Sequence, residues 1–379
     1  MLLIGSVVGA DAEHRTLLAE ADFDVTKVTP TNSSVNIIEV SQHMHRSDSP
    51  GELVVMSWAG GWGKGLLEAV SMPFTKLTGI PVRHETNIGL KLPAALLEAL
   101  EMGRRPPFDV VWSNSVPAMT MAQKGWSHPL DEGLTPNLAT LCSRCKPEGF
   151  SGWPFVSPYI VHYVMAYREE AFPHGKPDSW EVMLDPRYKG KVALYPGGNG
   201  FYPIAQTLGG GSLDGIPGDM AACWEFFRRL KPQVGHLGYS IGMGELIRRG
   251  ELDICFRALT NAIAFKDEGL AVSWVAPKEG ITDTADAFWI PKGVPDNVFF
   301  WANHYIDFAL SLEVQERWCD SMGVMPAHRE ARLPEALRTT SVFPKSAEDF
   351  SGVLHVPDIV KMRYEAEWES KFNEIFTGY

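Results

Sequence analysis

The sequence predicts an α/β protein built on parallel sheets. From Glu52 onward, strand-like and helix-like segments alternate, which is the pattern of parallel strands joined through helices. At 379 residues the chain exceeds the usual size of one hydrophobic core, so two domains are expected. Two glycine-rich turns, 56–65 and 196–200, each follow a strand and precede a helical stretch. Their repetition in two halves predicts two walls of one cleft.

The individual elements follow from apolar runs of strand length and from segments with helical period. The predicted strands are 53–56, 81–86, 108–112, 159–167, 191–195, 253–256, 271–276 and 287–290. The predicted helices are 66–77, 92–100, 243–249, 298–311, 313–321 and 358–376. Strand 159–167 is long enough to bridge two domains.

The first fifty residues are predicted to lie outside the folded part. The opening MLLIGSVVGADA is short and apolar but lacks the basic start of a secretory signal. Residues 13–50 show no sustained period. We expect 1–50 to be a leader or a loosely ordered arm, with the folded part beginning near Gly51. No apolar run of about 18 residues occurs, so no membrane-spanning helix is predicted.

Composition and charge exclude one class of partner. The chain has 45% hydrophobic and 21% charged residues, which is ordinary for a globular protein, and a formal net charge of -12. A nucleic-acid binder needs a concentrated basic face, and no long Lys/Arg run is present. We therefore expect no nucleic-acid partner.

Two of the five cysteines, Cys142 and Cys145, are close in sequence. A CxxC pair serves as half of a zinc site, as a redox pair or as a small disulfide. Cys223, Cys255 and Cys319 stand alone, so the second pair that a zinc site needs is missing. A disulfide or two unpaired loop thiols is the favoured interpretation, and no metal site is predicted.

The stretch MSWAGGWGKG (56–65) invites comparison with a phosphate-binding loop. The Walker pattern needs Gly five residues before its GK pair and Ser or Thr after it, but these positions hold Trp58 and Gly65. The dinucleotide pattern GxGxxG fails as well. Neither GxSxG, HExxH nor an EF-hand loop occurs, so the chain is not predicted to be an enzyme. Lys64 is expected to point to solvent.

An ordered series of short motifs carries a resemblance to a known family. They are LVVMSW (53–58), FDVVWS (108–113), SPY (157–159), DSWE (178–181), LDP (184–186), KGKVA (189–193), RGELDI (249–254), APKEG (276–280), IPKG (290–293), SLEVQ (311–315) and GVMP (323–326). In order and spacing, over 52–350, they resemble the extracellular solute-binding proteins of ABC importers. The similarity is to family 1 and its spermidine/putrescine-binding-like group.

The resemblance implies the type II periplasmic-binding fold: two α/β lobes, each a mostly parallel sheet flanked by helices, with the ligand cleft between them. Lobe 1 is expected to hold 51–157 and about 259–300, and lobe 2 to hold 158–258 and about 301–379. It implies capture of a small-molecule ligand by hinge closure and delivery to a membrane permease. The implied protein is a periplasmic monomer without a cofactor, released from an unusual N-terminal leader.

Candidate ligand contacts come from the carboxyl ends of strands, where open α/β sheets bind ligands, and from the lobe crossover. The predicted ligand-binding residues are Ser57, Trp58, Ala59, Gly60, Asn87, Ser113, Asn114, Ser115, Tyr159, His162, Gly197, Gly198, Asn199, Gly200, Arg257 and Asp286. For His162 a satisfied interior position is the competing interpretation, and for Arg257 it is a salt bridge. Trp62 and Trp112 are further candidates for aromatic walls.

The expected ligand is a small anionic or zwitterionic organic solute: a carboxylate, an amino-acid-like compound or a phosphonate. Where polyamine-binding relatives carry acidic residues, this chain has the neutral turn 196–200, whose NH groups suit an anion. Arg257 would hold a carboxylate. An amine end would need Asp286, Asp283 or Glu85. A polyamine-binding transport protein, or an enzyme on a similar scaffold, remains the alternative; iron is a minor one, because no Tyr-Tyr pair occurs.

Overall fold

The computed structural model describes residues 2–5, 23–30, 35–42, 49–87, 91–240, 242–338 and 344–377. Contacts divide the chain into two units, Met1–Pro50 and Gly51–Tyr379. In the first unit, β1 (Leu2–Gly5), β3 (Val35–Gln42) and β2 (Phe23–Pro30) form an antiparallel sheet in that order, which the sequence pattern did not predict. The predicted leader or loosely ordered arm lies largely outside the described residues.

Two sets of parallel strands make up most of the sheet in the second unit. The first set is β5-β4-β6, and the second set is β10-β9-β11. These strands are β4 (Leu53–Trp58), β5 (Val82–Asn87), β6 (Val110–Asn114), β9 (Val192–Leu194), β10 (Val234–Leu237) and β11 (Ile254–Ala258). Each set is the parallel sheet expected for half of the molecule.

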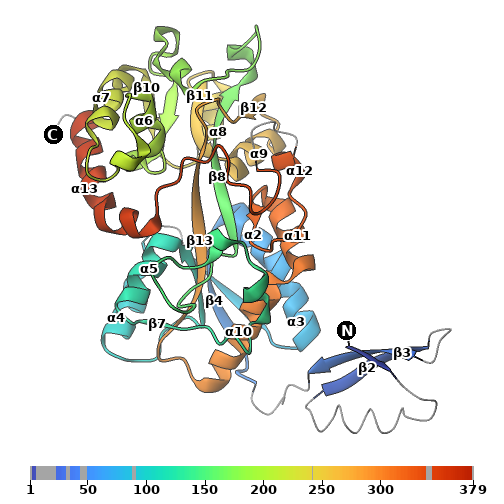
Figure 1. Cartoon of the computed structure of the whole chain (residues 1–379). Helices are drawn as coiled ribbons and strands as arrows, with labels where there is room; N and C mark the ends of the chain where they lie inside the picture. The colour runs from blue at the N-terminus through green and yellow to red at the C-terminus, as the bar shows by residue number, and fades with distance from the viewer. Residues whose placement is uncertain are drawn as a thin grey trace. The chain divides into compact units, whose positions relative to one another are not determined.

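Two long antiparallel strands join the sets, β8 (Tyr159–Arg168) and β13 (Thr282–Pro291). They run side by side through the middle of this unit, β8 in green and β13 in orange (Figure 1). β8 pairs with β11, and β13 pairs with β6, so the sheet is continuous in the order β10-β9-β11-β8-β13-β6-β4-β5. Short strands β7 (Ser127–His128), β12 (Val272–Val275) and β14 (Met325–Pro326) pair with β13, β8 and β8.

Helices flank both strand sets. Along the chain they are α2 (Gly60–Leu66), α3 (Met72–Thr78), α4 (Ala94–Glu101), α5 (Ser115–Gln123), α6 (Tyr202–Leu208), α7 (Ala221–Leu230), α8 (Met243–Arg248), α9 (Leu259–Asp267), α10 (Asp296–Leu310), α11 (Leu312–Met322), α12 (Glu335–Arg338) and α13 (Asp358–Thr377). α10 contacts β4, and α11 contacts α2. α13 contacts α5 as well as α7, and it lies along the edge of the fold between them (Figure 1). It therefore touches helices that belong to both strand sets.

The prediction of a glycine-rich turn at 56–65 is wrong, because most of this stretch is helical. β4 continues to Trp58, and α2 begins at Gly60. A side chain at Gly63 would place its Cβ 2.1 Å from the carbonyl oxygen of Trp58, and one at Gly65 would come within 3.3 Å of Met322. The glycines therefore allow α2 to pack against the end of its own strand and against α11. Glycine's poor intrinsic helix propensity explains why the sequence pattern indicated a turn.

Each predicted strand overlaps an observed one, but in the second unit β10 and the two-residue strands β7 and β14 were not predicted. Gly235 interrupts the apolar pattern of β10, and glycine in a strand commonly marks a close backbone approach. A Cβ at this position would lie 1.8 Å from the carbonyl oxygen of Gly190. The contact that requires glycine here is therefore the reason that the strand was not recognised.

Candidate functional site

A buried carboxylate, Asp286, collects hydrogen bonds from three elements. The Trp58 Nε1 donates to Oδ2 at 3.0 Å, the Tyr159 hydroxyl donates to the same oxygen at 2.6 Å, and the Asn114 Nδ2 donates to Oδ1 at 2.7 Å. The register explains the meeting, since Asp286 pairs directly with Asn114 at the carboxyl end of β6, and Trp58 ends the neighbouring β4. Four of the predicted site residues are thus brought together.

The carboxyl of Asp286 changes its charge close to neutral pH. Burial raises its pKa to about 6, against the hydrogen bonds from Tyr159, Trp58 and Asn114, which favour the ionised form. All of these donors are neutral, and Asp286 makes no ion pair among the described residues. A bound cation would supply the charge that the protein does not.

Aromatic rings surround this cluster. Trp58 and Trp112 meet edge to face with centroids 6.2 Å apart, and Tyr159 meets Trp62 at 6.0 Å and Trp318 at 5.1 Å. Trp58 and Trp62 are half-buried, whereas the others are fully buried. The half-buried pair presents the apolar, electron-rich ring surface that suits an amine or a flat organic group. Sequence reasoning missed Trp318, because the helical period of α11 predicts that this residue is buried but does not show which side chains it packs against.

The second strand set places Arg257 at the end of β11. Its side chain is fully buried: Nη1 donates to the carbonyl oxygen of Phe256 at 2.6 Å, and Nη2 to that of Gly238 at 2.9 Å. The guanidinium lies 4.4 Å from the ring centroid of Tyr195. The predicted alternative, a salt bridge, is not formed with any described residue. Among the described residues, the guanidinium is therefore met by two carbonyl dipoles, by the Met243 Sδ, 3.2 Å from Nε, and by the π-face of Tyr195.

Tyr195 is a residue that the sequence prediction missed. Its hydroxyl accepts hydrogen bonds from the backbone NH of Ala258 at 3.3 Å and from the Nδ2 of Asn261 at 3.0 Å. Its ring also meets Tyr163 at 5.6 Å and the exposed Tyr239 at 6.0 Å. Tyr195 immediately follows β9, so the same strand-end rule that selected Arg257 would have selected it.

The glycine turn after β9 is largely covered by α13. Gly197 and Gly198 are buried in the one-turn helix η8 (Pro196–Gly198), with left-handed φ of 66° and 73°. Added Cβ atoms would collide with Glu369 and Phe372, at 2.7 and 2.6 Å. Asn199 and Gly200 are half-buried, and a Cβ at Gly200 would come within 3.0 Å of the Tyr163 ring. The lack of side chains at Gly197 and Gly198 therefore leaves the room in which α13 packs against this turn.

The remaining predicted residues divide between the strand ends and other positions. Ser57 and Ser113 are buried, and the Ser113 hydroxyl accepts a hydrogen bond from the Trp289 Nε1 at 3.1 Å. Ala59 and Gly60 are exposed at the start of α2, and Ser115 is buried at the start of α5. Asn87 ends the edge strand β5, and its Nδ2 donates to the carbonyl oxygen of Lys91 at 3.0 Å. Lys64 is exposed, as predicted.

His162 lies on the other face of the crossover from Tyr159. Side chains three residues apart on a strand point to opposite faces, and the same spacing separates Asp283 from Asp286. His162 pairs with Asp283 across β8 and β13. Burial lowers the pKa of His162 to about 4, with a smaller opposing effect of Asp283. His162 is thus a neutral interior histidine beside a different carboxylate.

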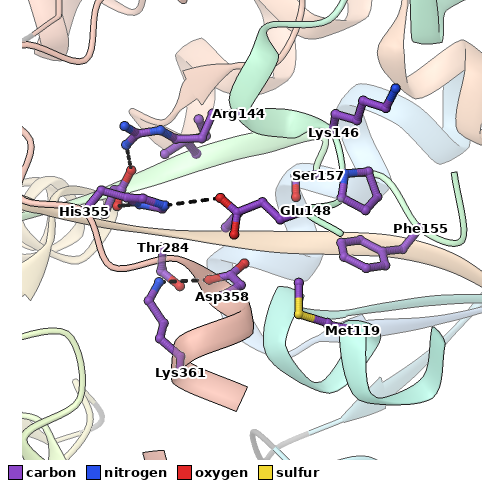
Figure 2. Close-up of a pocket in the computed structure, with 14 residues that line it drawn as sticks. Met119, Arg144, Lys146, Glu148, Phe155, Ser157, Thr284, His355, Asp358 and Lys361 are labelled. Carbon is purple, nitrogen blue, oxygen red and sulfur yellow. Dashed lines mark hydrogen bonds and ion pairs between the residues drawn. The ribbon is translucent and has the colours of Figure 1, made fainter. Parts of the chain in front are cut away.

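A small cavity of about 30 Å³ lies beside Asp283 (Figure 2). Arg144 and the Nδ1 of His355 both bond the Asp283 carboxylate, the latter at 2.7 Å, and Lys361 pairs with Asp358 at 2.9 Å. Burial would raise the pKa of Asp283, but the hydrogen bond and charge of His355 and the charges of Lys361 and Arg144 lower it well below its usual range. These groups satisfy one another, and the cavity holds one or two waters at most.

Within the part of the chain that the structure describes, no group of three or more His, Cys, Asp or Glu side chains is arranged to hold a metal ion. None of the described helices combines the length and the apolar character that crossing a bilayer requires.

These features define a class: two parallel α/β halves joined by antiparallel crossover strands, with polar and aromatic residues at the strand ends. The chain belongs to the bacterial extracellular solute-binding proteins, whose family model matches residues 69–345. Members of this family bind small ligands and work with ABC-transporter permeases, and they are transport proteins rather than enzymes. The family implies an extracytoplasmic location.

Solved structures share the two-lobed fold at low sequence identity. An ABC transporter substrate-binding protein from Bradyrhizobium japonicum has a TM-score of 0.73 and 18% identity, covering 86% of this chain and 99% of its own. MotA from A. tumefaciens B6, in complex with glucopine, has a TM-score of 0.69 and 18% identity, covering 86% of this chain and 99% of its own. AfuA from Actinobacillus pleuropneumoniae, with fructose-6-phosphate bound, has a TM-score of 0.66 and 18% identity, covering 87% of this chain and 99% of its own. No curated protein matches the sequence.

Proposed function

We propose that the protein captures a small zwitterionic organic solute in the periplasm and delivers it to its permease by hinge closure. The observation that carries the proposal is Asp286, a buried carboxylate with three neutral donors and no cationic partner among the described residues. An ammonium group would favour the ionised carboxylate, and the half-buried Trp58 and Trp62 would line the same position.

Arg257 supports an acidic group on the same ligand. A guanidinium buried without a carboxylate partner has a formal charge that an anion would compensate. Arg257 pairs with Val164 on β8, five residues beyond Tyr159, so the two backbone positions lie roughly 17 Å apart at the usual rise per residue. Because this spacing is odd, the Arg257 side chain leaves the strand on the opposite face from Tyr159, and we propose that the ligand reaches its guanidinium past the carboxyl end of β11. An extended zwitterion suits this arrangement better than one the size of glycine.

The lobes of the proposed hinge follow the predicted boundaries with two changes. We propose lobe 1 as 51–157 with about 277–322, and lobe 2 as 158–276 with the C-terminal remainder. The pairing of β12 with β8 and the contacts of α9 with β11 favour moving 259–276 to lobe 2, and the contacts of α10 with β4 and of α11 with α2 favour moving 301–322 to lobe 1. A ligand that contacts both lobes stabilises the closed state by its differential affinity.

A polyamine is the second candidate, and one observation favours it. Arg257 already donates to two carbonyl oxygens and stacks on Tyr195, an arrangement that a purely structural arginine would also show. If Arg257 is structural, Asp286 and the aromatic rings remain, and these suit a ligand with ammonium groups only.

Ligands matched in chain length distinguish these candidates. Thermal unfolding would be followed with 4-aminobutanoate, 6-aminohexanoate and 8-aminooctanoate, and with the diamine and dicarboxylate of each length. The proposal predicts that an amino acid raises the melting temperature more than both partners of its length, because it alone offers an ammonium and a carboxylate. Stabilisation by diamines alone would contradict the acidic-group argument.

Two variants locate the ligand's charges in the same assay. Arg257→Lys keeps the positive charge but removes the planar fork, so it should weaken the best amino acid while leaving the response to diamines unchanged. Asp286→Asn should weaken amino acids and diamines alike. Conversion of any of these compounds during incubation with the wild-type protein would instead favour an enzyme.

A further inference from the structure

A pair of buried thiols in lobe 1 has geometry that the solute site does not use. Cys142 immediately precedes the 3-10 turn η4 (Ser143–Cys145), and residues three apart on such a turn have eclipsed side chains. The Sγ atoms of Cys142 and Cys145 lie 3.0 Å apart, and both residues are buried. The two sulfur atoms are therefore neighbours without any rearrangement of the backbone fold.

The two residues between the cysteines hold the segment that precedes α13. Ser143 bonds Glu348 through its backbone NH at 3.3 Å and its hydroxyl at 3.2 Å. The Arg144 guanidinium lies 3.9 Å from the ring centroid of Phe350 and also pairs with Asp283 on β13. The turn thus connects the crossover strand to the C-terminal segment.

That segment leads into a helix that contacts both lobes. His355 bonds Asp283 at 2.7 Å, and Figure 2 shows it beside Arg144 and Glu148 at the cavity. α13 begins three residues later and contacts α5 of lobe 1 and both α7 and η8 of lobe 2. The 142–145 turn is therefore an anchor for the approach to this helix.

We propose that Cys142 and Cys145 are joined by a disulfide in the mature protein, and that the bond fixes this anchor. Disulfides persist in extracytoplasmic compartments, where this family is located. One S–S bond forms as two S–H bonds break; two protons are released, and two electrons pass to a disulfide oxidant through thiol–disulfide exchange. The bond holds the positions of Ser143 and Arg144 by restricting the four-residue turn.

The bond is tested on the full chain by counting thiols. The reduced, unfolded protein is refolded in a buffer of reduced and oxidised glutathione, then denatured and alkylated without a reductant. Because the chain has five cysteines, the proposed pair leaves three to alkylate: Cys223, Cys255 and Cys319. Peptide mapping should recover a peptide in which Cys142 is linked to Cys145. Five alkylated cysteines, or a link from Cys145 to Cys319, would overturn the proposal.

The anchoring role is tested separately by hydrogen exchange. Reduction of the oxidised protein should increase exchange in 344–357 more than in β4 and β6, because the turn that holds this segment is released. The double variant Cys142→Ser/Cys145→Ser should show the faster exchange before reduction and no change after it, while Cys223→Ser should behave as wild type. Equal exchange in the oxidised and reduced proteins would refute the anchoring role even if the bond forms.

Discussion

Two carboxylates three residues apart on β13 have opposite environments. Asp283 is bonded by Arg144 and His355, and its pKa is lowered. Asp286 receives only neutral donors, and burial raises its pKa to about 6. Both are buried, so solvent does not explain the difference. The protein compensates the charge of Asp283 from within, which marks a structural role. No cation among the described residues compensates that of Asp286, and we propose that the ligand does.

The largest expected effect is on folding, at the internally paired site. Asp283→Asn removes the anion that Arg144 and His355 share and should lower the free energy of unfolding by about 3 kcal/mol, because breaking a buried ion pair leaves its partners uncompensated. Urea unfolding measures this change. The ligand-induced rise in melting temperature should persist, and its disappearance would mean that the two carboxylates are not functionally distinct.

The matching change at Asp286 should act on binding instead. Asp286→Asn keeps the size of the side chain but removes the charge that an ammonium would meet. We expect a loss of about 2 kcal/mol or more in binding free energy, measured by calorimetric titration with the most stabilising amino acid. Its free energy of unfolding should stay at or above that of wild type, because no buried charge remains. A large loss of stability would assign Asp286 a structural role.

The pH dependence of binding provides a smaller and reversible change. As pH falls below about 6, the folded protein binds a proton at Asp286. In the unfolded chain the pKa of this carboxyl is 3.8, so protonation there needs a lower pH. This group therefore favours folding at low pH and loses that contribution as pH rises through 6. Affinity for an ammonium should fall by up to about tenfold per pH unit below 6. The slope should be absent from Asp286→Asn.

Asp283 is expected to respond in the opposite direction. Its folded pKa is lowered, so its contribution to stability is present above 3.8 and is lost as pH falls below that value. Unfolding followed between pH 5 and 3 should therefore show a loss of stability that Asp283→Asn reduces. An equal pH dependence in wild type and variant would indicate that other groups control acid unfolding.

The smallest expected effect comes from one donor to Asp286. Tyr159→Phe removes the hydroxyl that bonds Oδ2 at 2.6 Å and should cost about 1 kcal/mol of binding free energy. It should also raise the pKa of Asp286 further, since one donor to the ionised form is lost. The midpoint of the binding–pH curve would move upward. A midpoint shift in the other direction would show that the hydroxyl does not stabilise the carboxylate.

Sequence reasoning located the strand ends better than the contacts between them. The parallel arrangement and the motif series were enough for the fold. The strand-end rule selected Trp58 and Asn114, and the need for a carboxylate opposite an amine selected Asp286; the structure brings the three together. It could not show that α13 covers Gly197 and Gly198, because that packing joins residues about 170 positions apart in sequence. Nor does local pattern distinguish the environments of Asp283 and Asp286, which depend on Arg144 and His355 from distant segments.

The central claim is that Asp286, and not Asp283, meets the ligand. Its most direct test is the rise in melting temperature that 6-aminohexanoate and 1,6-diaminohexane produce in wild type, Asp283→Asn and Asp286→Asn. The account predicts that the amino acid stabilises the wild type more than the diamine does. Asp283→Asn should melt lower but keep this rise, and Asp286→Asn should lose it. Retention of the full rise in Asp286→Asn would contradict the account.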